Sequence, residues 1–89
     1  MRAVLTVIGK DMVGILAGVS NICAETGVNI VEVTQSILQD MFAMIMLVDI
    51  SASNVPFDEL SSRLSKYGEE NALSVRIMHE DIFNSMHRI

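Results

Sequence analysis

The residues best placed for chemistry lie between the first apolar run and the first helical pattern, where residues 9–14 read Gly-Lys-Asp-Met-Val-Gly. The segment is not a P-loop, because Ile15 and Leu16 follow where Lys and Ser or Thr are required. It also lacks the glycine pattern of a dinucleotide-binding turn. What it offers is a helix start whose free backbone N–H groups suit a carboxylate or another anion. A tight turn with a helix cap and no ligand is the alternative.

No set of side chains in the sequence points to catalysis. Cys23 falls on the apolar side of a helical pattern with no histidine nearby in sequence, which is typical of a buried structural thiol. His79 and His87 have no ligand-like spacing to each other or to Cys23. We therefore expect no enzymatic activity, no catalytic residue, no metal ion and no cofactor.

Length, composition and charge restrict the class of protein further. The 89 residues make a single domain, 1–89, and a single cysteine suits the reducing cytoplasm. The formal net charge is −5 and the six basic residues are scattered, whereas a nucleic-acid binder needs a clustered basic surface. The longest apolar run, residues 41–48, is far too short to span a membrane. A soluble cytoplasmic protein is expected.

Hydrophobic periodicity predicts the elements that hold the turn in place. Asp11 is a plausible helix N-cap and Gly27 a good helix stop, while Gln39 and Asp40 separate two strands of a hairpin. The predicted order is strand, helix, strand, strand, helix, strand and a short tail helix, over residues 3–8, 12–26, 29–38, 42–50, 56–67, 75–77 and 82–89.

This order predicts an α+β, ferredoxin-like βαββαβ sandwich, in which two helices lie on one face of an antiparallel sheet. The spatial order of its strands is fourth, first, third, second. Leu16 and Leu64 lie on helical stripes that should face the sheet. The two central strands are apolar at nearly every position, a pattern typical of strands buried on both faces. Because the helices cover only one face, the tail helix or a second subunit should cover the other, and we expect a homodimer or a higher even oligomer.

The order and spacing of several short motifs resemble the ACT domain family. Residues 4–11 and 13–17 look like its opening strand, turn and helix, with the pattern Gly-x-Asp-x-x-Gly-Ile/Leu-Leu/Ile, and residues 27–30 resemble its entry into the second strand. With residues 79–83 included, the whole chain is similar to short bacterial proteins made of a single ACT domain. Those proteins are distantly related to ACT regulators of glycine cleavage.

The resemblance implies small-molecule sensing rather than catalysis. ACT domains usually bind amino acids between domains, so the ligand, an amino acid or similar carboxylate, is expected where the 9–14 turn meets Asn29 near a subunit boundary. Met12 and Val13 replace the Arg-Pro often seen in the family's turn. The alternative is a ligand-free module that binds an unidentified protein through its sheet edge or C-terminal helix. The ligand-binding residues that the family's motif implies are Gly9, Asp11, Gly14, Ile15, Asn29 and Ile30.

Overall fold

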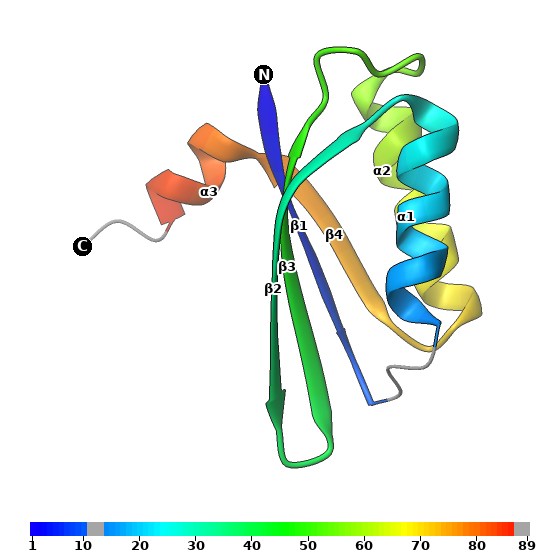
Figure 1. Cartoon of the computed structure of the whole chain (residues 1–89), viewed down its shortest axis with the longest axis vertical. Helices are drawn as coiled ribbons and strands as arrows, with labels where there is room; N and C mark the ends of the chain where they lie inside the picture. Colours follow the sequence, from blue (N-terminus) through cyan, green and yellow to red (C-terminus); the bar gives the residue numbers. More distant parts are fainter. Residues whose placement is uncertain (11–13, 87–89) are drawn as a thin grey trace.

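The computed structural model describes residues 1–10 and 14–86 and contains the predicted elements in the predicted order. Asp11 and the last residues of the expected tail helix, 87–89, lie outside the described residues. The elements, in chain order, are β1 (Arg2–Gly9), α1 (Ile15–Thr26), β2 (Asn29–Leu38), β3 (Met41–Asp49), α2 (Phe57–Glu70), β4 (Ser74–His79) and α3 (Glu80–Met86) (Figure 1).

The four strands form one antiparallel sheet in the order β2-β3-β1-β4, which confirms the ferredoxin-like prediction. Helices α1 and α2 lie together on one side of this sheet, and α3 lies on the other side (Figure 1). Along the central pair of strands, Arg2 is opposite Asp49 at one end and Gly9 is opposite Phe42 at the other. The connection from β1 to α1 and the start of β2 are therefore at opposite ends of the molecule.

The strand register divides the side chains of the sheet between two faces, since alternate residues of a strand point to opposite sides. The covered face packs against α1 and α2 and contains the most deeply buried residues of the strands, such as Leu5, Met44 and Met46. The open face points away from both helices. It consists of Arg2, Val4, Thr6 and Ile8 of β1, Ala43, Ile45, Leu47 and Asp49 of β3, Ser74, Arg76 and Met78 of β4, and Asn29, Glu32, Thr34 and Ser36 of β2.

The helices contribute to the core through narrow stripes. Leu64 of α2 is fully buried, as predicted, but Leu16 of α1 is 42% exposed, so its predicted place in the core is wrong. The buried side of α1 is formed by Ile15, Val19 and Cys23, which are four residues apart. Leu16 follows Ile15 directly and is rotated by about 100° around the helix axis, which turns it toward solvent.

Two tight turns need a left-handed backbone conformation. Gly27 ends α1 with φ of 75°, as predicted, and the next N–H, of Val28, donates to the carbonyl oxygen of Cys23 at 2.8 Å. In the β2–β3 hairpin, Gln39 adopts φ of 56° without being glycine. The predicted two-residue hairpin therefore forms although its turn residue is not the preferred one.

Candidate functional site

Helix α1 begins directly after Gly14. The N-cap residue is Gly14, with φ of 74°, rather than the expected Asp11, and no side chain among the described residues bonds to the first-turn N–H groups. The first turn also contains no acidic residue. Unpaired N–H groups and the positive end of the helix dipole favour a carboxylate at such a position.

Three of the described residues at this turn contribute in different ways. A Cβ at Gly9 would overlap the side chain of Leu73, so close packing is one reason for a glycine at this position. A Cβ at Gly14 would meet no atom within 4 Å, which leaves open space next to the helix start. Ile15 buries its side chain in the core, and only its backbone is available to a ligand. Gly14 is therefore the residue of the turn with room for a bound molecule.

Asn29 and Ile30 are not close to this turn within one chain. The 12 residues of α1 separate the two places by about 18 Å along the helix axis. In the sheet, Gly9 pairs with Phe42 while Asn29 pairs with Asp49, seven residues further along β3, or about 24 Å away. Figure 1 shows the two connections at opposite ends of α1. A ligand that touches both places has to lie between two copies of the chain.

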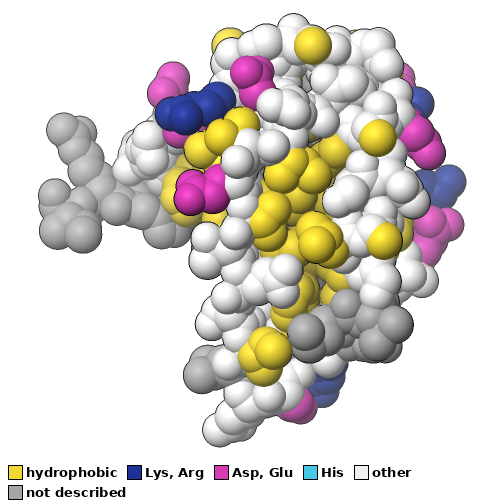
Figure 2. All heavy atoms as spheres, viewed as in Figure 1, with side chains coloured by type: hydrophobic (Ala, Val, Ile, Leu, Met, Phe, Trp, Pro, Cys, Tyr) yellow, Lys and Arg dark blue, Asp and Glu magenta, His cyan; other side chains and the backbone are white. Residues whose placement is uncertain are grey.

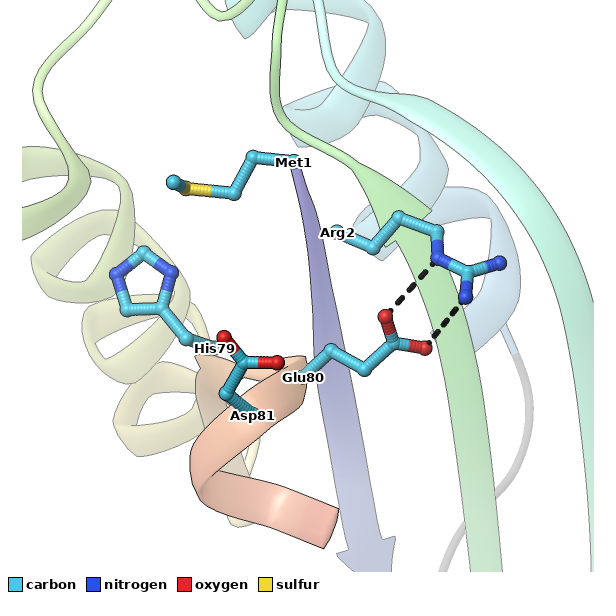
Figure 3. Close-up of a pocket in the computed structure, with 5 residues that line it drawn as sticks. All are labelled: Met1, Arg2, His79, Glu80 and Asp81. Atoms are coloured by element: carbon cyan, nitrogen blue, oxygen red, sulfur yellow. Dashed lines mark hydrogen bonds and ion pairs between the residues drawn. The ribbon is translucent and has the colours of Figure 1, made fainter.

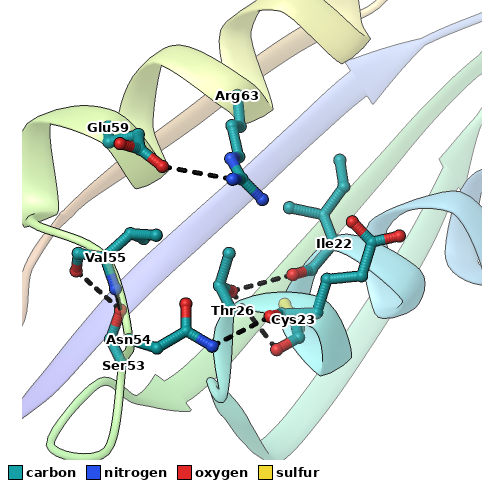
Figure 4. Close-up of polar contacts among 9 residues, drawn as sticks. Ile22, Cys23, Thr26, Ser53, Asn54, Val55, Glu59 and Arg63 are labelled. Atoms are coloured by element: carbon teal, nitrogen blue, oxygen red, sulfur yellow. Dashed lines mark hydrogen bonds and ion pairs between the residues drawn. The ribbon is translucent and has the colours of Figure 1, made fainter.

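The corner before Asn29 is held by hydrogen bonds from the loop after β3 (Figure 4). The backbone N–H of Asn54 donates to the carbonyl oxygen of Thr26 at 2.8 Å, and its side-chain Nδ2 donates to that of Glu25 at 3.0 Å. The buried hydroxyl of Thr26 donates to the carbonyl oxygen of Ile22 at 2.8 Å. These bonds fix the direction in which β2 starts, with Ile30 toward the core and Asn29 on the open face.

A hollow beside the N-terminus was not found by sequence reasoning. It is lined by Met1, Arg2, His79, Glu80 and Asp81 (Figure 3). Arg2 and Glu80 point toward each other and form two contacts, Nε to Oε1 at 3.1 Å and an Nη to Oε2 at 2.9 Å. The charges of Arg2 and Glu80 therefore satisfy each other and fasten α3 to β1. No short-range pattern joins residues 78 positions apart, so only the fold brings this pair together.

Other chemistry has little support in the described part of the chain. Burial raises the pKa of the Cys23 thiol, so this thiol is less nucleophilic at neutral pH. Within residues 1–10 and 14–86, no group of three histidine, cysteine or acidic side chains could hold a metal ion. None of the helices in these ranges has the length and apolar character needed to cross a membrane.

Comparison with known proteins shows where this fold recurs. The family model described as "ACT domain" matches residues 2–78. A UPF0237 protein of Clostridium acetobutylicum is 51% identical over the full length of both chains. Another from Methanocaldococcus jannaschii is 51% identical over 99% of this chain and 98% of that one, so similar proteins are not confined to bacteria. The solved structure of an ACT domain protein from Streptococcus pneumoniae is 36% identical, with a TM-score of 0.81 over 93% of both chains.

Proposed function

This chain belongs to the ACT domain family, and on that basis we propose that it is a regulatory module that senses a small carboxylate, most simply an amino acid. Domains of this family are regulatory, ligand-binding modules rather than catalysts. The observation that carries the proposal is the start of α1, where no described side chain caps the first-turn N–H groups and a Cβ at Gly14 would meet no atom within 4 Å. The free cysteine suits a reducing compartment, and we place the protein in the cytoplasm.

In this proposal the binding site is shared by two copies of the chain. Strand β2 is an edge strand, and it exposes Val31 and Ile37. Antiparallel pairing of this edge with β2 of a second copy reverses the direction of the partner's strand. The start of β2 of the partner subunit then lies beside the end of β2, at the level of Gly9 and the start of α1. The residues that are far apart in one chain would thereby meet across the boundary.

The surface next to β2 supports such a boundary. Figure 2 shows hydrophobic side chains gathered in a stripe between the strands and the helices on the face that carries α1 and β2. Ile22 of α1 and Ile30 and Val33 of β2 pack against the core and are only partly buried. A second copy at the β2 edge would remove this apolar area from water.

Calorimetry with amino acids tests the proposal most directly. We expect binding to the wild type and weaker binding to Gly14→Asn, because asparagine tolerates the left-handed φ while its side chain fills the open space. A valine at this position would strain the backbone and is less suitable. Asn29→Ala is expected to weaken binding by about 1–3 kcal/mol if it leaves a buried polar partner unpaired. Asn21→Ala, on the exposed side of α1, is the matched control.

Two results would contradict the proposal in different ways. If the wild type binds no amino acid at millimolar concentration, the assignment to amino acids fails and the ligand-free interaction module gains support. If the wild type binds but neither Gly14→Asn nor Asn29→Ala weakens binding, a ligand exists but its site lies elsewhere. A thermal-shift screen gives the first answer quickly, since a bound ligand raises stability by mass action.

A further inference from the structure

The open face of the sheet is apolar at its centre and uncovered there. Ile45 in the inner strand β3 is 46% exposed, and Ile8 in the inner strand β1 is 43% exposed. Among the described elements, helix α3 contacts β1 and β4, and Val4 of β1 is the buried residue among those described on this face. Contiguous exposed apolar surface on a small protein marks an interaction site. The chain therefore covers one end of this face and leaves the rest available.

Helix α3 adds more exposed apolar surface on the same side of the sheet. It projects from the end of β4, on the side opposite α1 and α2 (Figure 1). Its Ile82 and Met86 are 52% and 64% exposed and lie four residues apart, on one side of the helix. The open face and α3 thus both carry exposed apolar side chains on the same side of the sheet.

The charges on the open face are arranged so that the face is complementary to itself. Glu32 lies on edge strand β2 and Arg76 on the opposite edge strand β4, about 14 Å away across three strand spacings. Among residues 1–10 and 14–86, neither side chain takes part in an ion pair. The register places them in adjacent rows, Arg76 beside Thr6 and Glu32 beside Leu47. Both charges are therefore available to a partner from outside the chain.

We propose that the open face binds a second copy of this chain, with the two sheets face to face and their strands aligned. A twofold axis parallel to the strands places β4 of each copy over β2 of the other. Arg76 then reaches Glu32 of the partner subunit at both edges, while Ile45 and Ile8 are buried at the centre. A twofold axis that lies parallel to the sheets but runs across the strands would instead place β4 over β4. It would bring two Arg76 side chains together, which like-charge repulsion disfavours.

The same arrangement gives α3 a place to bind. Because α3 follows β4, it lies beside β2 of the partner subunit, and Ile82 and Met86 can pack against the partner's sheet. This interface is distinct from the β2-edge boundary of the proposed function and does not depend on it. If both exist, two different twofold axes combine and the chain assembles as a tetramer.

Light scattering after size exclusion tests the interface through its charges. We expect Arg76→Glu and Glu32→Arg, each alone, to raise the dissociation constant of this interface by at least about tenfold, because each places like charges opposite one another. Each single variant should then show a clearly lower average mass than the wild type at protein concentrations near the wild-type dissociation constant. The double variant should restore the wild-type mass. The 14 Å separation within one chain means that this restoration can come only from contact between copies.

Matched controls separate the interface from general effects of charge and from other assemblies. Lys66→Glu and Glu25→Arg make the same charge changes on the helices α2 and α1, and they should leave the mass unchanged. Pairing of the β4 edge with the β2 edge of another copy would also bring Arg76 near Glu32 of the partner subunit, but it would leave Ile45 uncovered. Ile45→Glu should therefore halve the mass only if the sheets pack face to face. Circular dichroism on each variant checks that the monomer remains folded.

The proposal is overturned if both single charge reversals leave the mass unchanged, if the double variant fails to recover the wild-type mass, or if Ile45→Glu assembles like the wild type. A wild type of one chain at every concentration would also overturn it. A wild type of one chain would also contradict a ligand site shared by two copies, whereas the results on the charge reversals and on Ile45→Glu concern this interface alone. Calorimetry on the wild type measures amino-acid binding separately, so a failure of this interface can be told apart from a failure of the proposed function.

Discussion

The two faces of the sheet differ sharply although the same strands form them. On the covered face, Leu5, Met44 and Met46 are completely buried by α1 and α2. On the open face, Ile8 and Ile45 of the same strands remain exposed. Apolar residues at successive positions of the inner strands point to both faces of the sheet. Helices α1 and α2 cover only one of these faces. This difference is the basis for the proposal that a second copy of the chain completes the open face.

The largest effect on stability should come from the covered side. Leu64→Ala removes a fully buried side chain of α2 and leaves a cavity, so we expect a loss of about 2–5 kcal/mol in the free energy of unfolding. Leu16→Ala on α1 is the matched control, with an expected loss below about 1 kcal/mol because that side chain is partly exposed. Chemical denaturation measures both. Equal losses of unfolding free energy in the two variants would contradict the assignment of Leu64 to the core and of Leu16 to the surface.

Cys23 reports on the covered side in a second way. Its thiol is buried on α1 and its pKa is raised by desolvation. A thiol reagent should therefore react about 100-fold or more slowly with the folded protein than with the protein in denaturant, because the core must open first. A rapid reaction under native conditions would mean that α1 separates from the sheet far more easily than the packing indicates.

A smaller effect is expected on the open side, where α3 is attached. Arg2→Ala removes the paired contacts to Glu80, and we expect a loss of about 0.5–1 kcal/mol, since both side chains are partly exposed. The loss should be accompanied by reduced protection of α3 in hydrogen exchange. Arg63→Ala, which breaks an ion pair with Glu59 within α2, is the control that should leave α3 unchanged. Unchanged protection in Arg2→Ala would show that the ion pair does not hold α3.

The smallest effect concerns pH and Asp49 on the open face. The pKa of Asp49 is lowered, chiefly because its carboxylate accepts a hydrogen bond from the backbone N–H of Ser51 at 2.9 Å. A lowered pKa means that the stabilisation is present above about pH 4 and is lost as the pH falls through the folded-state pKa. Asp49→Asn should therefore be slightly less stable at neutral pH and lose less stability on acidification. An identical acid dependence in both proteins would contradict this assignment.

Element order and strand pairing were predictable from the sequence because they depend on local patterns. Period-two alternation marked residues 29–38, and the match with β2 is complete. Gly27 marked the end of α1 because only a left-handed conformation closes the helix there. The apolar character of the inner strands also predicts a cover for the second face of the sheet, and this stays a prediction.

Other features depend on distances that a local pattern does not contain. Leu16 fits a three- and four-residue spacing as well as its neighbours do, and only the packing of α1 shows which side faces inward. The family resemblance predicted that the 9–14 turn and Asn29 contribute to one ligand site. Within one chain, however, the length of α1 keeps them apart. The pairing of Arg2 with Glu80 likewise requires that β1 and β4 be neighbours.

The mass of the wild-type protein in solution tests the central claim most directly, because both the shared ligand site and the face-to-face interface require more than one copy. Size exclusion with light scattering at micromolar concentration should show a species of two or four chains. A single species at the mass of one chain, 9.8 kDa, would contradict the account.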